Sequence, residues 1–331
     1  MNQACSLRRQ KSVRPDTQAS LYPAAVLTQA IPQFIRGFLM GSADIVPGVS
    51  GGTVALVVGI YERLIHSIRQ GAAALGRLVR ADVTGAIEKL KTVEWSFLIP
   101  LGVGILTAVI VLSSVVGDLL DERPIEMAGL FFGLIIGSTV IAWHLLRSPQ
   151  TYHLAIVAVV AVVAFVGLGL RGGGVDEESV NQASDPTVLA FFLAGAIAIC
   201  AMILPGVSGS FLLVMLGMYE PVLDAISDRE ISSVLIFGLG CIIGLALFST
   251  LLDRLLATNH DDVLAALIGL MLGSLRVLWP WPGGIDTTEL AGPSDPVLVP
   301  VVLALVSAIL VVVVGRLGIS REASRKTAVA D

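Results

Sequence analysis

Residues 41–62 read GSADIVPGVSGGTVALVVGIYE, and residues 199–220 read ICAMILPGVSGSFLLVMLGMYE. At an offset of 158, the stretches 47–62 and 205–220 share eight identities in sixteen positions, including the whole block PGVSG. Each block interrupts an apolar region, 34–62 in the first case and 188–220 in the second. Because proline ends a helix and glycine permits a tight turn, the sequence predicts an internal duplication built around two broken apolar elements.

The duplication continues beyond these two blocks at a smaller offset of 136. The longer basic segment that follows the first block accounts for the change in offset. Each repeat is therefore expected to contain one broken element and three further apolar spans. The matched residues are Gly102, Gly104, Gly133, Gly137, Ser138 and Trp143 in the first repeat, and Gly238, Gly240, Gly269, Gly273, Ser274 and Trp279 in the second.

Composition places the chain in a membrane. Of its 331 residues, 55% are hydrophobic and 14% are charged, with a mean hydropathy of +0.87. A soluble domain carries roughly 25% charged residues, so most of this apolar surface must face lipid. The net charge of −5 argues against a nucleic-acid partner, which requires a basic face. Scattered cysteines (Cys5, Cys200, Cys241) and four histidines without ligand spacing predict no disulfide framework, metal site or cofactor.

Six apolar runs are long enough to cross a bilayer, which takes about 17–25 residues. We therefore expect an all-α integral membrane protein, a transporter-like bundle of inverted repeats with two re-entrant helical hairpins and about six full transmembrane helices. The expected spans are Trp95–Gly117, Gly129–Leu146, Leu154–Leu170, Ser233–Leu252, Val263–Trp279 and Val297–Gly315.

Positively charged residues decide whether the broken elements cross the membrane. If both are re-entrant hairpins, 17 Lys and Arg fall on the cytoplasmic side and 4 outside; if both cross fully, the split is 12 and 9. The hairpin arrangement follows the positive-inside rule much better. With three spans in each repeat, the second repeat is then inverted relative to the first, and both termini are cytoplasmic. The localisation expected is the inner or plasma membrane.

This topology divides the chain into five parts. The first repeat contains the hairpin 34–62 and a basic cytoplasmic segment, 63–94, in which Leu75, Leu78, Val79, Ile87 and Leu90 recur at helical spacing. We expect this segment to be a connecting helix, with a helix lying on the membrane surface as the alternative. The parts are a cytoplasmic tail 1–33, the first repeat 34–170, an external linker 171–187, the second repeat 188–315 and a cytoplasmic tail 316–331.

The tips of the two hairpins are the candidate binding site. Non-helical backbone inside a bilayer is tolerated only where protein or water surrounds it. The first amides of an outgoing helix lack intrahelical partners and carry the positive end of its dipole, so two facing tips would bind an anion such as phosphate. The candidate substrate-binding residues are Gly48, Val49, Ser50, Gly51, Gly52, Gly206, Val207, Ser208, Gly209 and Ser210, with Pro47 and Pro205 as hinges.

Five charged residues near the hairpins have candidate roles. Asp44 lies three residues before the first tip, and its counterpart in the second repeat is Met202, so the halves differ chemically. A carboxylate at that depth costs about 2.5–3.5 kcal/mol, which predicts a coupling or gating role, or else a hydrogen-bonded structural role. Glu62 and Glu220, each beside a tyrosine, are interfacial anchors or gates. Arg36 and Arg276 are candidate head-group contacts.

The two motif-bearing segments, MGSADIVPGVSGGTVALVVGIYERLI (40–65) and ILPGVSGSFLLVMLGMYEPVL (203–223), resemble a known family. They are similar to the polyprenyl-phosphate transporters of bacteria and archaea, formerly a domain of unknown function. The resemblance covers about Arg36 to Gly315. It implies a flippase, not an enzyme, that returns undecaprenyl phosphate from the outer to the cytoplasmic leaflet and so recycles the lipid carrier for cell-envelope synthesis. The tip residues would contact the phosphate.

Two other functions are alternatives to a lipid flippase. A secondary transporter or channel for a small anion would use the same midplane site, but through a closed, water-lined path. A polyprenyl-pyrophosphatase needs a histidine nucleophile and a cluster of basic residues around the phosphate, and the sequence contains neither arrangement. We therefore prefer a polyprenyl-phosphate translocase, with transport of a small anion as the alternative. The oligomeric state, including a homo-oligomer, is left open by the sequence.

Overall fold

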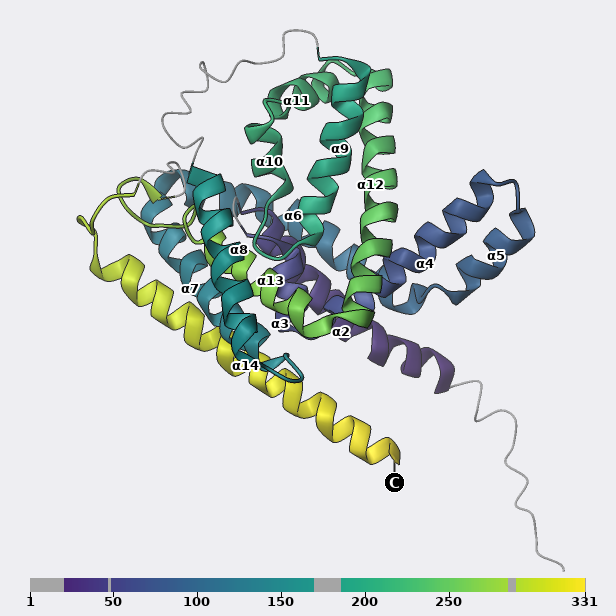
Figure 1. Cartoon of the computed structure of the whole chain (residues 1–331), viewed down its shortest axis with the longest axis horizontal. Helices are drawn as coiled ribbons and strands as arrows, with labels where there is room; N and C mark the ends of the chain where they lie inside the picture. The colour runs from purple at the N-terminus through teal and green to yellow at the C-terminus, as the bar shows by residue number, and fades with distance from the viewer. Residues whose placement is uncertain (1–20, 47–48, 170–185, 285–289, 331) are drawn as a thin grey trace, which may run out of the picture.

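The computed structural model describes residues 21–46, 49–169, 186–284 and 290–330, with only the backbone for 21–29 and 317–330. Over these residues all regular structure is helical, which confirms the predicted all-α class (Figure 1). The helices of the first half are α2 (Leu21–Asp44), α3 (Gly51–Val57), α4 (Tyr61–Val79), α5 (Val83–Thr92), α6 (Trp95–Glu122), α7 (Pro124–His144) and α8 (Thr151–Gly169). Those of the second half are α9 (Val188–Ile203), α10 (Gly209–Met215), α11 (Tyr219–Ser227), α12 (Ile231–Thr258), α13 (His260–Ser274) and α14 (Leu298–Ala330).

Five helices of the described chain are long and apolar enough to cross a membrane: α6, α7, α8, α12 and the part Leu298–Arg316 of α14. The predicted sixth span, Val263–Trp279, is wrong in its extent, because α13 ends at Ser274 after 15 residues. Turns follow it at residues 275–278. Side chains on the spans are widely exposed, for example Ile110 at 77% and Leu247 at 70%, as contact with lipid requires.

The sequence duplication reappears in the helix packing. Helix α2 packs along α6, and α9 packs along α12. A Cβ at Gly37 would collide with the backbone of Leu101, and a Cβ at Gly195 would collide with the backbone of Phe237. These two contacts lie at repeat-equivalent positions, offset by 158 and 136. Small residues let membrane helices approach closely, so the duplicated glycines set the same close packing twice.

The remaining long helices pair between the repeats. Helix α7 packs along α14, and α13 packs along α8. Gly133 lies against Ala304 in the first pair, and its repeat mate Gly269 lies against Val157 in the second. Each repeat therefore supplies a helix that packs against the other repeat. Helix α14 crosses the bundle obliquely, and its backbone continues to Ala330, beyond the boundary expected at residue 316 (Figure 1).

The predicted breaks at the PGVSG blocks lie between α2 and α3 and between α9 and α10, and a second break, which the sequence did not predict, follows each tip. Gly59 separates α3 from α4 with φ +73°, and its repeat mate Gly217 separates α10 from α11 with φ +67°. Backbone at such φ values favours glycine, which explains why these positions carry it twice. The chain turns by 106° between α10 and α11. Before the first tip, α2 begins at Leu21 and not near residue 34, so the apolar helix is longer than expected.

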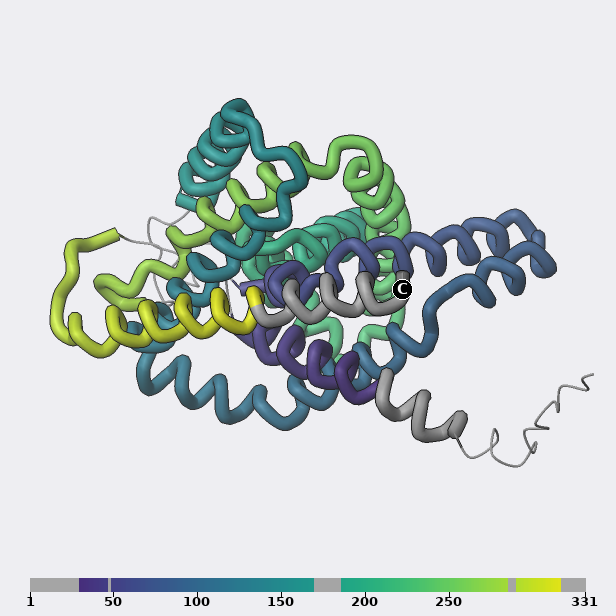
Figure 2. Tube along the Cα trace, turned by 90° about the horizontal axis from the view of Figure 1, so that it is seen from below, coloured from purple at the N-terminus to yellow at the C-terminus, as the bar shows by residue number. Residues whose placement is uncertain are grey.

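The basic segment folds as two helices and not as one connecting helix. Helices α4 and α5 pack on each other and project sideways from the bundle in both views (Figures 1 and 2). The turn between them ends at Asp82, whose carboxylate caps α5 by accepting a hydrogen bond of 2.8 Å from the Gly85 amide. At its base, α4 packs against α12 through ion pairs from His66 and Arg69 to Asp253.

The largest buried cluster joins the first broken element to both repeats. Leu56 of α3 and Ile65 of α4 pack with Phe97 of α6, Leu256 of α12 and Ile268 of α13. A separate cluster holds the second broken element together, where residues of α9, α10 and α11 pack against one another. The first tip is therefore packed by helices of both repeats, whereas the second tip is packed by its neighbouring helices α9 and α11.

Candidate functional site

The two tips contact each other directly. The hydroxyl of Ser50 donates a hydrogen bond of 2.9 Å to the carbonyl of Met202, and the amide of Gly206 donates one of 3.0 Å to Oγ1 of Thr53. The hydroxyl of Tyr61 donates to the carbonyl of Ile203 at 3.3 Å. Ser50 and Thr53 are fully buried. The structure thus brings the two PGVSG blocks together, although they are more than 150 residues apart in sequence.

The first tip has no free amides at the start of its helix. The Gly51 amide donates to the Asp44 carboxylate at 2.6 Å, and the Gly52 amide donates to the Ser50 hydroxyl at 3.1 Å. The Thr53 amide donates to the carbonyl of Ser50 at 2.9 Å. The sequence predicted open amides on both tips. This expectation fails for the first tip, because Asp44 already supplies an anion there.

The second tip is more open. Ser208 caps α10 through a hydrogen bond of 3.5 Å from the Phe211 amide, and its hydroxyl pairs with that of Ser210 at 2.8 Å. The amides of Gly209 and Ser210 have no acceptor among the described residues. Ser210 is exposed, and the thioether of Met202 stands beside Gly209 where the first repeat has a carboxylate. The predicted chemical difference between the halves is therefore located at the tips.

Two glycines allow the close approach of the tips. Gly206 has φ +84°, and a Cβ there would press on Met271. A Cβ at Gly52 would lie 2.6 Å from the carbonyl oxygen of Ile203. The other candidates differ: Pro205 and Val49 are buried packing residues, Val207 is half-buried, and Pro47 and Gly48 lie outside the described residues.

The candidate charged residues do not gather at the tips. Glu62 lies at the far end of the first broken element, where it pairs with His260. Glu220 lies in the first turn of α11, next to the exposed Tyr219. The guanidinium of Arg36 donates to Gln33 on the same helix at 3.2 Å. Arg276 lies with its guanidinium 4.9 Å from the centre of the Phe165 ring, and its buried Nε has no hydrogen-bond partner in the described chain.

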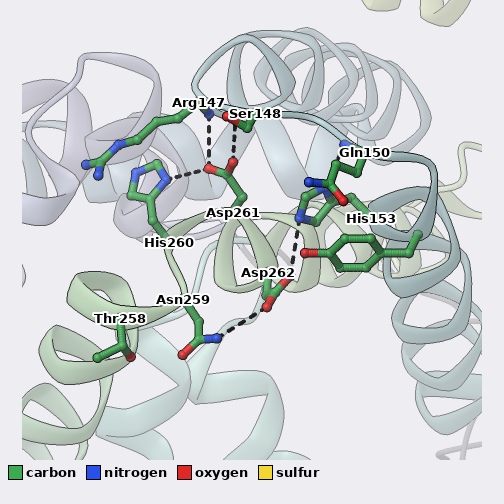
Figure 3. Close-up of a pocket in the computed structure, with 10 residues that line it drawn as sticks. Arg147, Ser148, Gln150, His153, Thr258, Asn259, His260, Asp261 and Asp262 are labelled. Atoms are coloured by element: carbon green, nitrogen blue, oxygen red, sulfur yellow. Dashed lines mark hydrogen bonds and ion pairs between the residues drawn. The ribbon is translucent and has the colours of Figure 1, made fainter.

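A polar cluster that the sequence analysis missed lies where the α7–α8 and α12–α13 loops meet. Both ring nitrogens of His260 contact carboxylates at 2.8 Å, Nε2 to Glu62 and Nδ1 to Asp261. Asp261 also accepts hydrogen bonds from the amides of Arg147 and Ser148, at 3.0 and 2.8 Å. Figure 3 shows Asp261 pointing into this loop, at the edge of a cavity of about 380 Å³.

Hydrogen bonds within the polar cluster stabilise the ionised form of Asp261. Burial raises the pKa of Asp261, but the hydrogen bonds from His260 and from the two loop amides outweigh it and lower that pKa to about 2. Next to it, Nε2 of the buried His153 lies 3.2 Å from Asp262. The run HDD at 260–262 was a visible signal, but its partner Glu62 is 198 residues away. No group in the described chain has the arrangement of a metal site.

Comparison with known proteins gives the family. Residues 40–292, about three quarters of the chain, match the family model described as VCA0040-like, undecaprenyl phosphate translocase-like. The chain belongs to this family. The matched range contains the residues of both tips and ends beyond α13.

Two curated relatives are named polyprenyl-phosphate transporter. The protein of Vibrio cholerae serotype O1 is 40% identical over 252 residues, which cover 75% of this chain and 77% of the relative. The protein of Staphylococcus aureus is 30% identical over 259 residues, covering 74% of this chain and 85% of the relative. No solved structure matches the chain. The family confirms the resemblance seen in the sequence, and both relatives are named as transporters and not as enzymes.

Proposed function

We propose that this chain is a polyprenyl-phosphate translocase that carries undecaprenyl phosphate from the outer to the cytoplasmic leaflet, recycling the lipid carrier for cell-envelope synthesis. The relatives' names support the substrate class. The observation that carries the proposal is the pair of touching tips, one with its first amide bound to the Asp44 carboxylate and the other with two open amides.

In this proposal the phosphate binds at the second tip. The amides of Gly209 and Ser210, together with the hydroxyls of Ser208 and Ser210, offer hydrogen-bond donors at one helix start. The exposed side chains of Met202 and Leu216 lie on the same broken element, and they provide apolar surface for the start of a prenyl tail. A head group and a tail are thus accommodated by neighbouring residues.

Asp44 has the gating role in this mechanism. Its carboxylate holds the Gly51 amide in the way that a phosphate oxygen would. Displacing Asp44 would open the first tip, so that a phosphate at the second tip could contact both repeats. Because Ser50 and Thr53 link the tips, a movement of one tip is transmitted to the other. Binding and conformational change are therefore coupled through the same residues.

The proposed topology is an inverted pair of re-entrant hairpins with cytoplasmic termini. Helix α2 descends beside α6 as far as Gly41, which lies against Ile105 and Ala108 near the middle of α6. After the tip, Arg63 pairs with Glu94 at the start of α6, so the chain has returned to the same end. Asp253, near the end of α12, pairs with Arg69 on the same helix α4. The start of α6 and the end of α12 therefore both lie beside α4, as expected if α6 and α12 run antiparallel. Inversion of the second repeat requires this arrangement.

Arg276 is proposed to receive the head group at the outer side. Its guanidinium lies over Phe165, and its buried Nε has no partner among described residues. Arginine binds phosphate through paired N–H groups, so an incoming head group would satisfy it. Arg36, on α2, would contact the head group on the cytoplasmic side. Transport of a small anion is the alternative use of the tips, and the apolar residues beside Ser210 favour the lipid.

The test follows a polyprenyl phosphate across the bilayer of liposomes containing the purified protein. Ser208→Ala and Gly209→Val should slow its movement, because a side chain at 209 would press on Met202 and on the carbonyl of Ala198. Gly238→Val is the matched control, since a Cβ there meets nothing within 4 Å. Unchanged movement in both tip variants would contradict the proposal. Release of trapped inorganic phosphate at the same rate as the lipid would instead favour the small-anion alternative.

A further inference from the structure

The α4–α5 hairpin carries a continuous apolar surface that no described part of the chain covers. Its small residues Ala74, Gly85 and Ala86 are buried where the two helices meet. Its large apolar residues point away from that contact and are exposed by 36% to 81% of their area. They are Leu75, Leu78 and Val79 on α4, and Val83, Ile87 and Leu90 on α5.

Helix geometry places both apolar rows on one side of the hairpin. At 100° per residue, Leu75 and Val79 lie about 100–140° around α4 from Ala74. Val83, Ile87 and Leu90 lie about 90–150° around α5 from the midpoint of the buried pair Gly85 and Ala86, in the same rotational sense. Because the two helices run antiparallel, equal rotations in the same sense point to the same side. The hairpin is therefore an amphipathic two-helix unit and not a simple connection.

The charges of the hairpin are divided between structural and free ones. Arg63 pairs with Glu94, Arg69 with Asp253 and Arg77 with Asp82. Arg80, Lys89 and Lys91 have no ion pair within the described chain. Unpaired basic residues on the polar side of an amphipathic unit with an exposed apolar row are the pattern of helices that bind the interface of an anionic bilayer.

The hairpin lies at the level of a membrane interface. Helix α5 ends at Thr92, and the membrane-spanning helix α6 begins at Trp95. The indole of Trp95 is 46% exposed and donates a hydrogen bond of 2.8 Å to the carbonyl of Leu90. Exposed tryptophan at the start of a span marks the boundary between lipid and water. Both views show the hairpin leaving the bundle sideways from this point (Figures 1 and 2).

We infer that the α4–α5 hairpin lies on the bilayer, with its apolar row among the acyl chains and with Arg80, Lys89 and Lys91 on anionic lipid head groups. The contact goes beyond the proposed transport and places a lipid-binding platform beside the first broken element. Since α4 continues directly from the break at Gly59 and holds α12 through Asp253, the platform anchors the moving part of the molecule to the membrane surface.

The first experiment maps which side of the hairpin faces lipid. Full-length protein without its native cysteines carries one fluorescent label, at Val79→Cys or Ile87→Cys, in vesicles of phosphatidylcholine and phosphatidylglycerol. Lipids with a nitroxide near the head group should quench these labels, and aqueous iodide should quench them poorly. The matched controls are Ala73→Cys and Glu88→Cys, exposed neighbours on the other side, which iodide should reach. Equal iodide quenching at all four positions would overturn the inference.

The second experiment tests the charges. With the label at Ile87→Cys, nitroxide-labelled phosphatidylglycerol should quench about twofold more than labelled phosphatidylcholine, because each basic residue near an anionic surface adds attraction. The triple variant Arg80→Gln, Lys89→Gln, Lys91→Gln should lose this preference and keep the apolar contact. No preference in the unsubstituted hairpin would contradict head-group binding. Protection from iodide that depends on protein density and not on lipid would show a second copy on this face, and would likewise reject the inference.

Discussion

The Asp44 carboxylate accepts a hydrogen bond of 2.6 Å from the amide of Gly51, seven residues later, and so occupies the start of the helix in the first tip. Its repeat mate Met202 stands in the corresponding place in the second tip and offers no comparable acceptor. The two tips therefore have similar sequences, but the first already has a carboxylate at the start of its helix and the second does not. This difference leads to the first two predictions.

Replacing Asp44 with asparagine should separate charge from shape. The amide oxygen can still accept from Gly51, so the fold should be retained, but the residue can no longer carry a charge or a proton. We expect slower transport with a flatter dependence on pH, measured with polyprenyl phosphate in liposomes at several pH values. Transport at the original rate and with the original pH profile would show that Asp44 is only structural.

Placing a carboxylate in the second tip should block it. In Met202→Asp, the new side chain can reach the open amide of Gly209, as Asp44 reaches Gly51. The new carboxylate would compete with the phosphate and repel it. We expect the transport rate to fall about tenfold or more, which corresponds to an activation free energy about 1.4 kcal/mol higher. Met202→Leu, which keeps size and removes polarity, is the control and should transport normally. Equal rates in the two variants would place the phosphate elsewhere.

The contact between the tips should tolerate no side chain at position 52. A Cβ in Gly52→Ala would lie 2.6 Å from the backbone oxygen of Ile203, so the tips must separate. Overpacking of this kind costs about 1–3 kcal/mol, which should appear as a lower melting temperature in detergent and as slower transport. Gly102→Ala is the matched control, because a Cβ there meets nothing within 4 Å. A melting temperature equal to that of the control would argue against close contact.

The polar cluster at the α12–α13 loop should stabilise the protein in a predictable pH range. Because the pKa of Asp261 is lowered to about 2, its contribution is fully present above the ordinary value of 3.8 and is lost as pH falls towards 2. Asp261→Asn should therefore lower the melting temperature by a constant amount from about pH 5 to pH 8, with the difference shrinking in acid. Asp121→Asn, at an exposed site, should change nothing. A difference that grows on acidification would contradict the assignment.

Much of this architecture was predictable because it is written twice in the chain. The PGVSG blocks predicted the duplicated breaks and the matched glycines marked the repeat, whereas the equivalent close packing at Gly37 and Gly195 came from the structure alone. The sequence also led us to expect two facing tips, and the hydrogen bonds from Ser50 to Met202 and from Gly206 to Thr53 join them. Charge counting supplied the orientation in the membrane, which stays a prediction.

The features that could not be predicted depend on pairing across long stretches of sequence. The sequence around Asp44 does not show which group its carboxylate contacts, and the hydrogen bond from the Gly51 amide is visible only in the structure. The contact of His260 with Glu62 joins residues 198 positions apart. Hydropathy alone extended α13 too far, because the apolar run continues beyond the end of the helix at Ser274. The apolar residues of the basic segment follow a helical spacing throughout, so the sequence did not show that α4 and α5 are separate helices.

The exchange of helices between the halves has a consequence for how such a chain can arise. Helix α7 finds its partner in α14, and α13 finds its partner in α8, so each half leaves one glycine-lined surface that only the opposite half can cover. A protein consisting of one half alone would leave this surface uncovered unless a second copy packed against it. Fusion of two such copies into one chain, followed by the divergence of Asp44 from Met202, would produce two halves that each complete the packing of the other.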